Sequence, residues 1–258
     1  MLFSDGGSSS GRNAAGACVV EDRTRHTRVC LAVYLGAATN NEAESAASLL
    51  GFSALRALHG DSTPVSVHWV SDSEYVLKSA TAYIRNWQRN GWQTADKKPV
   101  KNQGLWRAYL ALTHSFKIKA EHVKGHSGHP ENEACDQASL WARNFADEFD
   151  AGKSWVREDL DTPIGTDCWT CFDGRVLLEG VRSESPSEEQ NLELVRLLGE
   201  FFRSKDNESD QQAPKPVSLR PVLGILEQAK SAAGRLSSRS PEARDLEIEI
   251  DLLLSRFR

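Results

Sequence analysis

The stretch Val65-Ser-Val-His-Trp-Val-Ser-Asp72-Ser-Glu-Tyr-Val-Leu-Lys78 contains a strand pattern that changes into a helix pattern at one acidic residue. Val65, Val67 and Trp69 alternate with polar neighbours, which predicts a strand with one buried face over 65–71. Helical spacing of apolar residues then extends from residue 73 to about 90. The junction therefore places Asp72 at the end of a strand, where a helix begins.

Similar patterns on both sides of this stretch define a domain. Strand-like alternation recurs in four segments and helical spacing in three, at about 2–5, 16–22, 28–35 and 117–123, and at about 42–58, 103–114 and 130–149. Three leading strands with short connections indicate an antiparallel meander, whereas strands separated by helices indicate crossover connections. We therefore predict an α/β domain over 1–148, with a five-stranded mixed sheet flanked by helices.

The character of the sequence changes after residue 148, and we expect 149–258 to form a mostly helical C-terminal extension. A hairpin is expected within 168–180, because Asp173-Gly174 supplies the positive φ of a tight turn. Ser187-Glu-Glu-Gln190 is a capping-box pattern. Helices are expected at about 188–203, 221–236 and 241–257, and the polar segment at about 204–218 is interpreted as a solvated linker.

Composition is that of a soluble globular protein able to bury a core, since 40% of its 258 residues are hydrophobic and 26% are charged. The chain has no apolar run of membrane-spanning length and no signal-peptide pattern at Met1, so we expect neither secretion nor membrane insertion. Its five cysteines are an odd number without the spacing of a disulfide framework, which favours a reducing, cytoplasmic setting.

The net charge of −5 is unevenly distributed along the chain. Residues 1–150 contain 16 Lys and Arg against 16 Asp and Glu, and residues 151–258 contain 15 against 20, so the acid excess belongs to the C-terminal part. Within the neutral part, basic residues gather between 85 and 101. Separated charge of this kind suits a protein that holds phosphate with one region and metal with another.

Four acidic residues occupy positions where a chain ordinarily places an apolar or capping residue. Asp5 and Asp72 end strands, Glu44 begins the core-facing stripe of its helix, and Asp136 lies beside the apolar face of the last helix. Each has an ordinary structural alternative as a turn, cap or first-turn acid. If they converge, their repulsion requires cations, and oxygen ligands favour magnesium or manganese. Periodicity alone leaves open whether they converge.

Five sequence motifs follow one another in the first part of the chain. They are Phe3-Ser-Asp5-Gly, Thr39-Asn-Asn-Glu-Ala-Glu44, Ser71-Asp72-Ser-Glu-Tyr-Val, Ile84-Arg-Asn-Trp-Gln-Arg-Asn-Gly-Trp-Gln-Thr-Ala-Asp-Lys-Lys-Pro-Val-Lys-Asn102, and Lys124-Gly-His126-Ser-Gly-His-Pro-Glu-Asn-Glu-Ala-Cys-Asp136. In order and spacing, this set resembles the type 1 ribonuclease H family, and the fourth motif resembles the basic protrusion of its bacterial members. The resemblance covers roughly the first 145 residues and implies a ribonuclease H-like fold.

The resemblance also implies an endonuclease that hydrolyses the RNA strand of RNA·DNA hybrids, with 5′-phosphate and 3′-hydroxyl products. In that family, the acids matching Asp5, Glu44, Asp72 and Asp136 hold two magnesium ions, for which manganese can substitute. His126 matches a histidine in a flexible loop that helps to protonate or release the product. Without the flanking motif, a lone histidine would be interpreted as a surface or core residue.

Two substrate-binding regions follow from the same resemblance. Asn13, Thr39, Asn40 and Asn41 match groups that read the minor groove or lie near a DNA phosphate pocket, with turn and cap chemistry as the alternative. The basic segment is expected to bind phosphates of the DNA strand through Arg85, Trp87, Arg89, Trp92, Lys97, Lys98 and Lys101. Helix packing is an equal alternative for Trp87 and Trp92, and it is the preferred interpretation for Trp106.

Three positions depart from the family pattern. The usual Asp-Gly-Ser start is here Asp5-Gly6-Gly7-Ser8, which displaces one side-chain contact. Glu74 stands where a glutamine that contacts the minor groove is usual, and we keep it among the substrate-binding residues, where its carboxylate would weaken binding or alter metal preference. Tyr83 replaces a common tryptophan and keeps an aromatic ring.

Other functions remain as alternatives. They are a non-catalytic hybrid-binding module, another nuclease of the ribonuclease H-like superfamily, and a zinc-binding domain, for which Cys168 and Cys171 supply only half of a tetrahedral set. The extension carries no motif that we assign to a family. It would form a small bundle, a self-association contact or a docking site for a protein partner, and an accessory packing element is an equal alternative; we expect a monomer.

Overall fold

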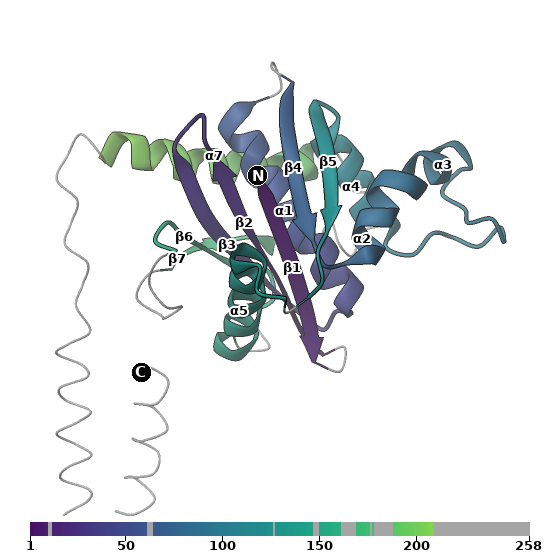
Figure 1. Ribbon diagram of the computed structural model, residues 1–258, viewed down its shortest axis with the longest axis horizontal. Coiled ribbons are helices and arrows are strands. Elements are labelled where there is room, and N and C mark those ends of the chain that lie inside the picture. The colour runs from purple at the N-terminus through teal and green to yellow at the C-terminus, as the bar shows by residue number, and fades with distance from the viewer. Residues whose placement is uncertain are drawn as a thin grey trace, which may run out of the picture. The chain divides into compact units, whose positions relative to one another are not determined.

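A computed structural model of the chain describes residues 1–9, 12–60, 64–125, 127–146, 150–160, 169–175, 177 and 188–208. They belong to one of two units into which the chain divides; the other unit, 165–168 and 211–258, lies outside the described residues. A single sheet organises the described unit, and its strands have the order β5-β4-β1-β2-β3-β6-β7 (Figure 1). The strands are β1 (Leu2–Ser9), β2 (Asn13–Asp22), β3 (Thr27–Gly36), β4 (Val65–Ser71), β5 (Phe116–His122), β6 (Lys153–Arg157) and β7 (Thr170–Asp173).

The first three strands form an antiparallel meander, because short turns connect them. At the turn between β2 and β3, the Asp22 carboxylate accepts hydrogen bonds from the backbone N–H and the hydroxyl of Thr24, at 2.9 and 2.7 Å. β4 lies parallel to β1, and β5 parallel to β4, because helices connect these strands. The mixed sheet and the meander predicted from the sequence are confirmed.

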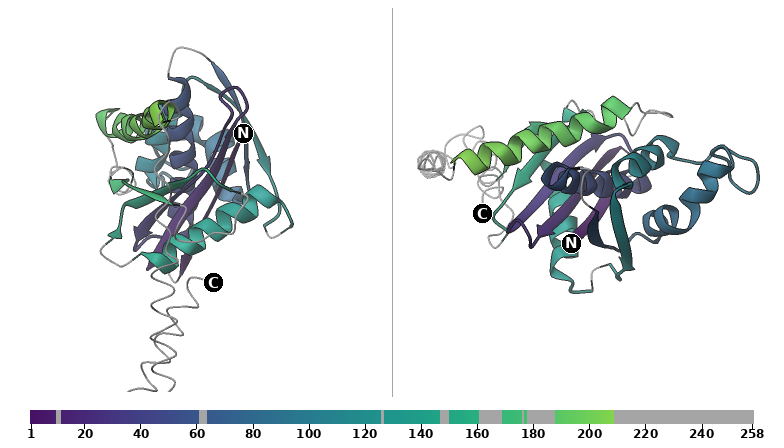
Figure 2. Two further views of the ribbon diagram at one scale, coloured as in Figure 1. Left: turned by 90° about the vertical axis from the view of Figure 1, so that its left-hand side faces the viewer. Right: turned by 90° about the horizontal axis from the view of Figure 1, so that it is seen from above.

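Alternation along the strands separates two hydrophobic layers. Leu2 and Cys18 lie on the face that α1 (Asn40–His59) covers, and Phe3 and Ala17 lie on the face that α5 (Pro130–Phe145) covers. Figure 2 shows the two helices on opposite sides of the sheet. The helix expected over 130–149 ends at residue 145, where the backbone becomes extended.

The segment between β4 and β5 consists of several helical pieces. The helix predicted over 73–90 is divided into α2 (Glu74–Lys78), a π-helix η1 (Ser79–Tyr83) and α3 (Ile84–Arg89), and α4 (Gln103–Thr113) follows a loop. The Ile84 N–H donates to the Ser79 carbonyl, a bond to the fifth preceding residue that defines the π-helix. Apolar spacing does not reveal one extra residue in a turn. In Figure 1, α3 and the following loop project away from the sheet.

The sheet contains seven described strands, so the prediction of five is wrong. β6 pairs with β3 over Cys30–Val33, and β7 pairs with β6, both antiparallel. The hairpin expected within 168–180 is also wrong, because Thr170–Asp173 pairs with β6 while Arg175 and Leu177 are helical. Asp173-Gly174 signals a turn but not the partner of the strand before it. The edge of β3 determines the pairing: β6 forms the backbone hydrogen bonds that this edge would otherwise leave unmade, and β7 then pairs with β6.

Later elements pack on both faces of the sheet. Trp155 of β6 is 3% exposed, its ring meets Trp141 of α5 edge-on at 5.2 Å, and Trp169 stacks on Trp141 at 4.6 Å. On the other face, α7 (Glu188–Glu208) buries Leu194 and Leu198 in the layer that contains α1. α7 lies where a helix over 188–203 was expected, and it includes the first residues of the expected linker.

The remaining expectations for the extension concern residues outside the described ranges. These are the helices at 221–236 and 241–257 and the rest of the linker. Within the described ranges, no helix is both long and apolar enough to cross a membrane.

Candidate active site

Asp5 lies in the middle of β1 rather than at its end, because Gly6 and Gly7 continue the pairing with β2. Its half-buried side chain shares a face of the strand with Phe3, and its Oδ1 accepts a hydrogen bond of 2.6 Å from the Gly6 N–H. Gly6 faces the opposite way. A Cβ there would lie 2.4 Å from the Ala43 carbonyl carbon and 2.5 Å from the Glu44 nitrogen. Glycine therefore allows β1 to lie directly against the start of α1, next to Glu44.

Ser73 connects Glu44 with the end of β4. The Ser73 hydroxyl donates to Oε2 of Glu44 and also caps the start of α2. The Asn40 amide donates to Oε1 of Glu44 at 2.9 Å, so both oxygens of this carboxylate are oriented by neighbours. Asp72, the residue before Ser73, is half-buried at the junction between β4 and α2. The strand-to-helix junction that the sequence predicted thus lies beside the start of α1.

Asp136 and the loop after β5 complete the site. Asp136 is half-buried in α5, next to Cys135, whose side chain is fully buried against the sheet. In the loop, a Cβ on Gly125 would lie 2.7 Å from Oδ2 of Asp72, so the backbone passes directly against this carboxylate. His126, the next residue and a candidate from the sequence, lies outside the described residues.

Asp5 lies within the electrostatic influence of the other three carboxylates. Burial, followed by the charge of Asp72, raises the pKa of Asp5 to about 7; Asp136 and Glu44 contribute smaller increases, and the hydrogen bond from the Gly6 N–H opposes them. Burial also raises the pKa of Glu44, against the hydrogen bond from the Ser73 hydroxyl and together with the charge of Asp72. The structure therefore brings all four predicted acids into one cluster, which we call the acidic cluster.

The acidic cluster fits a hard divalent cation in its chemistry. It supplies only oxygen ligands, and Asp5, Glu44 and Asp72 form no ion pair within the described ranges, so a bound cation would relieve their repulsion. No group of three or more His, Cys, Asp or Glu side chains among the described residues is arranged to hold a metal ion. The fit therefore rests on the donor atoms and their charge, not on coordination geometry.

Three candidates for minor-groove contact lie at the start of α1. Thr39 is the N-cap residue of α1 and forms a capping box with Glu42. Asn40 accepts a hydrogen bond of 3.1 Å from the Ser8 N–H, in addition to its bond to the acidic cluster, and so joins the β1–β2 turn to it. Asn41 is exposed. Cap and turn chemistry thus occupies Thr39 and Asn40, as the structural alternative anticipated.

The fourth candidate, Asn13, contacts a residue that the sequence analysis missed. Its amide donates a hydrogen bond of 3.2 Å to the Arg143 carbonyl near the end of α5. The Arg143 guanidinium lies over Gly7, where a Cβ would be 3.2 Å from its terminal nitrogen. The available signal was helical spacing, because Arg143 follows Asp136 by seven residues and so lies on the same side of the helix.

Glu74 is directed away from the acidic cluster. Its exposed carboxylate accepts a hydrogen bond of 2.6 Å from Lys78, one turn further along the chain, and this bond is the main cause of its lowered pKa. Glu74 is not among the charges that shift the pKa of Asp5 or Glu44. The substitution therefore adds a surface ion pair rather than a fifth acid of the cluster.

The basic protrusion, residues 84–102, presents its charges to solvent while its rings pack inside. Trp106, which supports it from α4, is 1% exposed, and Trp92 is 7% exposed with the Arg107 guanidinium 4.6 Å from its ring centroid. Packing therefore accounts for both. Trp87 is half-buried, with its ring 6.1 Å from that of Trp106. The predicted cations of the protrusion are all exposed: Arg85, Arg89, Lys97, Lys98 and Lys101.

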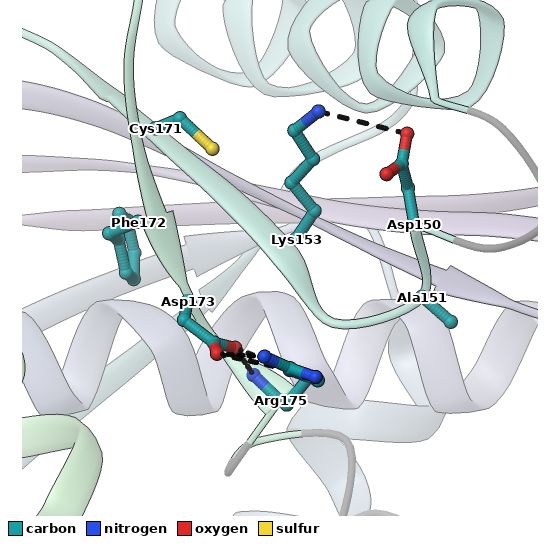
Figure 3. Close-up of a pocket in the computed structure, with 7 residues that line it drawn as sticks. All are labelled: Asp150, Ala151, Lys153, Cys171, Phe172, Asp173 and Arg175. Carbon is teal, nitrogen blue, oxygen red and sulfur yellow. Dashed lines mark hydrogen bonds and ion pairs between the residues drawn. The ribbon is translucent and has the colours of Figure 1, made fainter.

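A separate cavity of about 470 Å³ lies at the β6–β7 ribbon. Figure 3 shows its charged side chains in two pairs, Lys153 with Asp150 at 3.7 Å and Arg175 with Asp173 at 2.6 Å. Cys171, one of the two cysteines considered for zinc, lines the same cavity, and burial raises its pKa. Because its charges are balanced, the cavity has no electrostatic preference comparable to that of the acidic cluster.

The described unit is therefore an α/β domain with a mixed sheet, an acidic cluster and an exposed basic protrusion, and comparison with known proteins identifies its family. The family model for RNase H matches residues 1–143. The ribonuclease H of Vibrio campbellii is 38% identical over 151 residues, which are 58% of this chain and 94% of that protein. The ribonuclease H of Serratia proteamaculans is 37% identical over 151 residues, 58% of this chain and 93% of that protein.

Among solved structures, the chain is similar to LC9-RNase H1, described as a type 1 RNase H with the type 2 active-site motif. The identity is 21%, the TM-score is 0.46, and the match covers 56% of this chain and 71% of that chain. The family match and the curated relatives are decisive: this chain belongs to the ribonuclease H family and is a ribonuclease H hydrolase.

Proposed function

We propose that the chain is an endonuclease that hydrolyses the RNA strand of RNA·DNA hybrids by two-metal-ion catalysis, leaving 5′-phosphate and 3′-hydroxyl ends. The observation that carries this proposal is the grouping of the acids in the acidic cluster, where burial and the charges of three other carboxylates raise the pKa of Asp5 to about 7. Such a concentration of negative charge beside a substrate that is itself anionic has a role only with cations present.

Asp5, Glu44, Asp72 and Asp136 would hold the two ions, Mg²⁺ or Mn²⁺. When bound, the ions would lower the pKa of the attacking water and stabilise the leaving 3′ oxygen. The chain itself sets the spacing of the ligands through the close contact of Gly6 with α1. His126 is proposed to donate a proton to the leaving 3′ oxygen, following the family pattern.

Substrate binding is proposed at two regions on either side of the cluster. The start of β2 and the start of α1 would read the minor groove through Asn13, Asn40 and Asn41, with Thr39 and Asn13 near a DNA phosphate pocket. The exposed cations of the protrusion would bind phosphates of the DNA strand, with Trp87 and its exposed edge contributing a ring contact. Because Trp92 is buried, its contribution would be to hold the protrusion in shape.

We further propose that residues 1–148 carry the activity and that 149–258 form an accessory extension to a monomeric, cytoplasmic enzyme. The packing of β6, β7 and α7 on the sheet supports an accessory role. A reducing location is consistent with Cys18, Cys30 and Cys135, which are buried in the core and form no disulfide within the described part of the chain.

The decisive experiment uses an end-labelled RNA·DNA hybrid with Mg²⁺ or Mn²⁺, and single-stranded RNA and duplex DNA as controls. The wild-type chain should cleave only the hybrid, and the products should carry 5′-phosphate ends. Asp72→Asn should remain folded and lose cleavage, since a metal ligand is gone. Asp173→Asn, the same change at an exposed residue of β7, should cleave normally.

Two results would reject the proposal. A wild-type chain that leaves hybrids intact with both metals would exclude the activity. Full cleavage by Asp72→Asn would exclude the proposed ligand set.

A further inference from the structure

Arg143 lies on the same side of α5 as Asp136, two helical turns further along. Its side chain is half-buried, and within the described ranges it forms no ion pair. Arg196 of α7, by contrast, forms ion pairs with Glu193 and Glu200. A half-buried guanidinium without an ion pair is unusual, because its desolvation is not offset by a carboxylate.

The position of the guanidinium depends on Gly7. A Cβ at Gly7 would lie 3.2 Å from one terminal nitrogen and 3.3 Å from the central carbon of Arg143, closer than the usual contact of about 3.5–4.0 Å. Gly7 is also the position at which the chain departs from the Asp-Gly-Ser pattern. The glycine removes a hydroxyl from β1, and the Arg143 guanidinium fills the space.

The same strand relates this guanidinium to the chemistry. Gly7 follows Asp5 by two residues, so both lie on one face of β1 and are about 7 Å apart along the strand. The phosphate to be cut would lie over Asp5 and the other acids. A group held over Gly7 would therefore lie near the next phosphate of the same nucleic-acid strand.

Hydrogen bonding shows that Arg143 is not part of a closed structural network. Its Nε and the Oδ1 of Asn13 are both buried and have no hydrogen-bond partner in the described part of the chain. Nor is Arg143 among the groups that shift the pKa of Asp5 or Glu44, so it does not act as the counter-charge of these two acids. Its terminal nitrogens remain as donors for an external anion.

We propose that Arg143 binds the phosphate adjacent to the scissile phosphate on the RNA strand, replacing the contact that Gly7 no longer provides. This inference rests on the proposed function. A planar guanidinium can donate two parallel hydrogen bonds to phosphate oxygens. It also offsets the repulsion between the acidic cluster and the incoming strand.

The test measures binding of a fluorescent hybrid to the full chain carrying Asp72→Asn, so that no cleavage occurs, between about 50 and 200 mM salt. Adding Arg143→Gln should weaken binding roughly 10- to 100-fold, as expected for hydrogen bonds to a charged group. The slope of log K against log salt should decrease in magnitude by about 0.9, the value for one phosphate contact. Arg143→Lys should restore the slope but only part of the affinity.

Arg196→Gln is the matched control, because it removes the same charge from exposed α7, on the opposite face of the sheet (Figure 2). It should leave both affinity and slope unchanged. A neutral methylphosphonate, placed in turn at each phosphate flanking the cut, should locate the contact. At the correct phosphate, the chains with and without the Arg143→Gln substitution should bind equally, and at the other flanking phosphate the difference should persist.

Unchanged affinity and slope in Arg143→Gln, with normal thermal unfolding, would overturn the proposal. The proposal would also be overturned if Arg143→Gln, in a chain that keeps Asp72, changed only the Mg²⁺ concentration for half-maximal cleavage. That result would indicate that Arg143 acts as a counter-charge to the acidic cluster. Loss of hybrid cleavage by the wild-type chain would instead reject the proposed function, since the binding measurements do not depend on turnover.

Discussion

Replacing Gly6 with alanine should disturb the acidic cluster by separating β1 from α1. The new Cβ would lie 2.4 Å from the Ala43 carbonyl carbon and 2.5 Å from the Glu44 nitrogen. Ordinary carbon contacts are about 3.5–4.0 Å, so the strand and helix must move apart by about 1 Å. Neither atom belongs to a flexible side chain, and the backbone of α1 has to shift as a unit.

The displacement has two measurable effects. Overpacking of this kind should lower the free energy of unfolding by about 1–3 kcal/mol, measured by urea denaturation. A shift of about 1 Å between Asp5 and Glu44 should reduce kcat/KM for hybrid cleavage on the order of 100-fold. This reduction is larger than the lost stability alone explains. Both assays are made on the full chain at a temperature where the variant is folded.

Gly199→Ala on α7 serves as the control. Its Cβ would meet the end of the Arg203 side chain at 3.2 Å, which can move away, and alanine is favoured in a helix by about 1 kcal/mol. This variant should be as stable as the wild type or more so. If Gly6→Ala keeps normal stability and cleavage, the contact between β1 and α1 does not set the spacing of the acidic cluster.

Two other predictions concern stability. Burial alone would raise the pKa of Asp22, but hydrogen bonds from Thr24 and the ion pair with His59 outweigh it, so the pKa is lowered. A lowered carboxyl pKa stabilises the fold above the unfolded value of about 3.9, and the contribution is lost as pH falls through the folded pKa. His59→Gln should therefore be less stable than wild type in urea at about pH 5.5, with a smaller deficit at about pH 3; equal deficits would contradict the linkage. Trp155→Ala should cost about 3–5 kcal/mol in the same assay, because its ring is buried between β6 and α5, whereas exposed Leu192→Ala should change stability by less than about 0.5 kcal/mol. A neutral effect of Trp155→Ala would show that β6 is not integral to the folded unit.

Hydrophobic period and motif order predicted the mixed sheet and the grouping of the acids from the sequence. Asp72 is the clearest example, since alternation up to Ser71 and helical spacing afterwards define its place. Gly6 shows the limit of such reasoning. A glycine pair after an acid reads as the start of a turn, yet Gly6 continues β1, because its lack of a side chain serves a long-range contact with α1.

Other features depended on partners that local pattern does not specify. The strand over Lys153–Arg157 is short, and its pairing is determined by the open edge of β3, far away in sequence. Arg143 carries little signal in the sequence, because an arginine in the last turn of a helix is commonly explained by favourable interaction with the helix dipole. Its relation to Gly7 appears only when β1 and α5 are placed side by side.

The π-helix at Ser79–Tyr83 makes chain length, and not only composition, a constraint on this enzyme. Each residue of a helix turns the following one by about 100°, so the extra residue in this turn fixes the direction in which α3 leaves α2. Ser73, the N-cap residue of α2, bonds to Glu44 of the acidic cluster, and Trp87 of α3 lies against Trp106. The number of residues between α2 and α3 therefore sets the orientation of the protrusion relative to the acidic cluster. Substitution in this segment leaves that direction unchanged, whereas insertion or deletion of a residue would rotate α3 and the protrusion relative to α2.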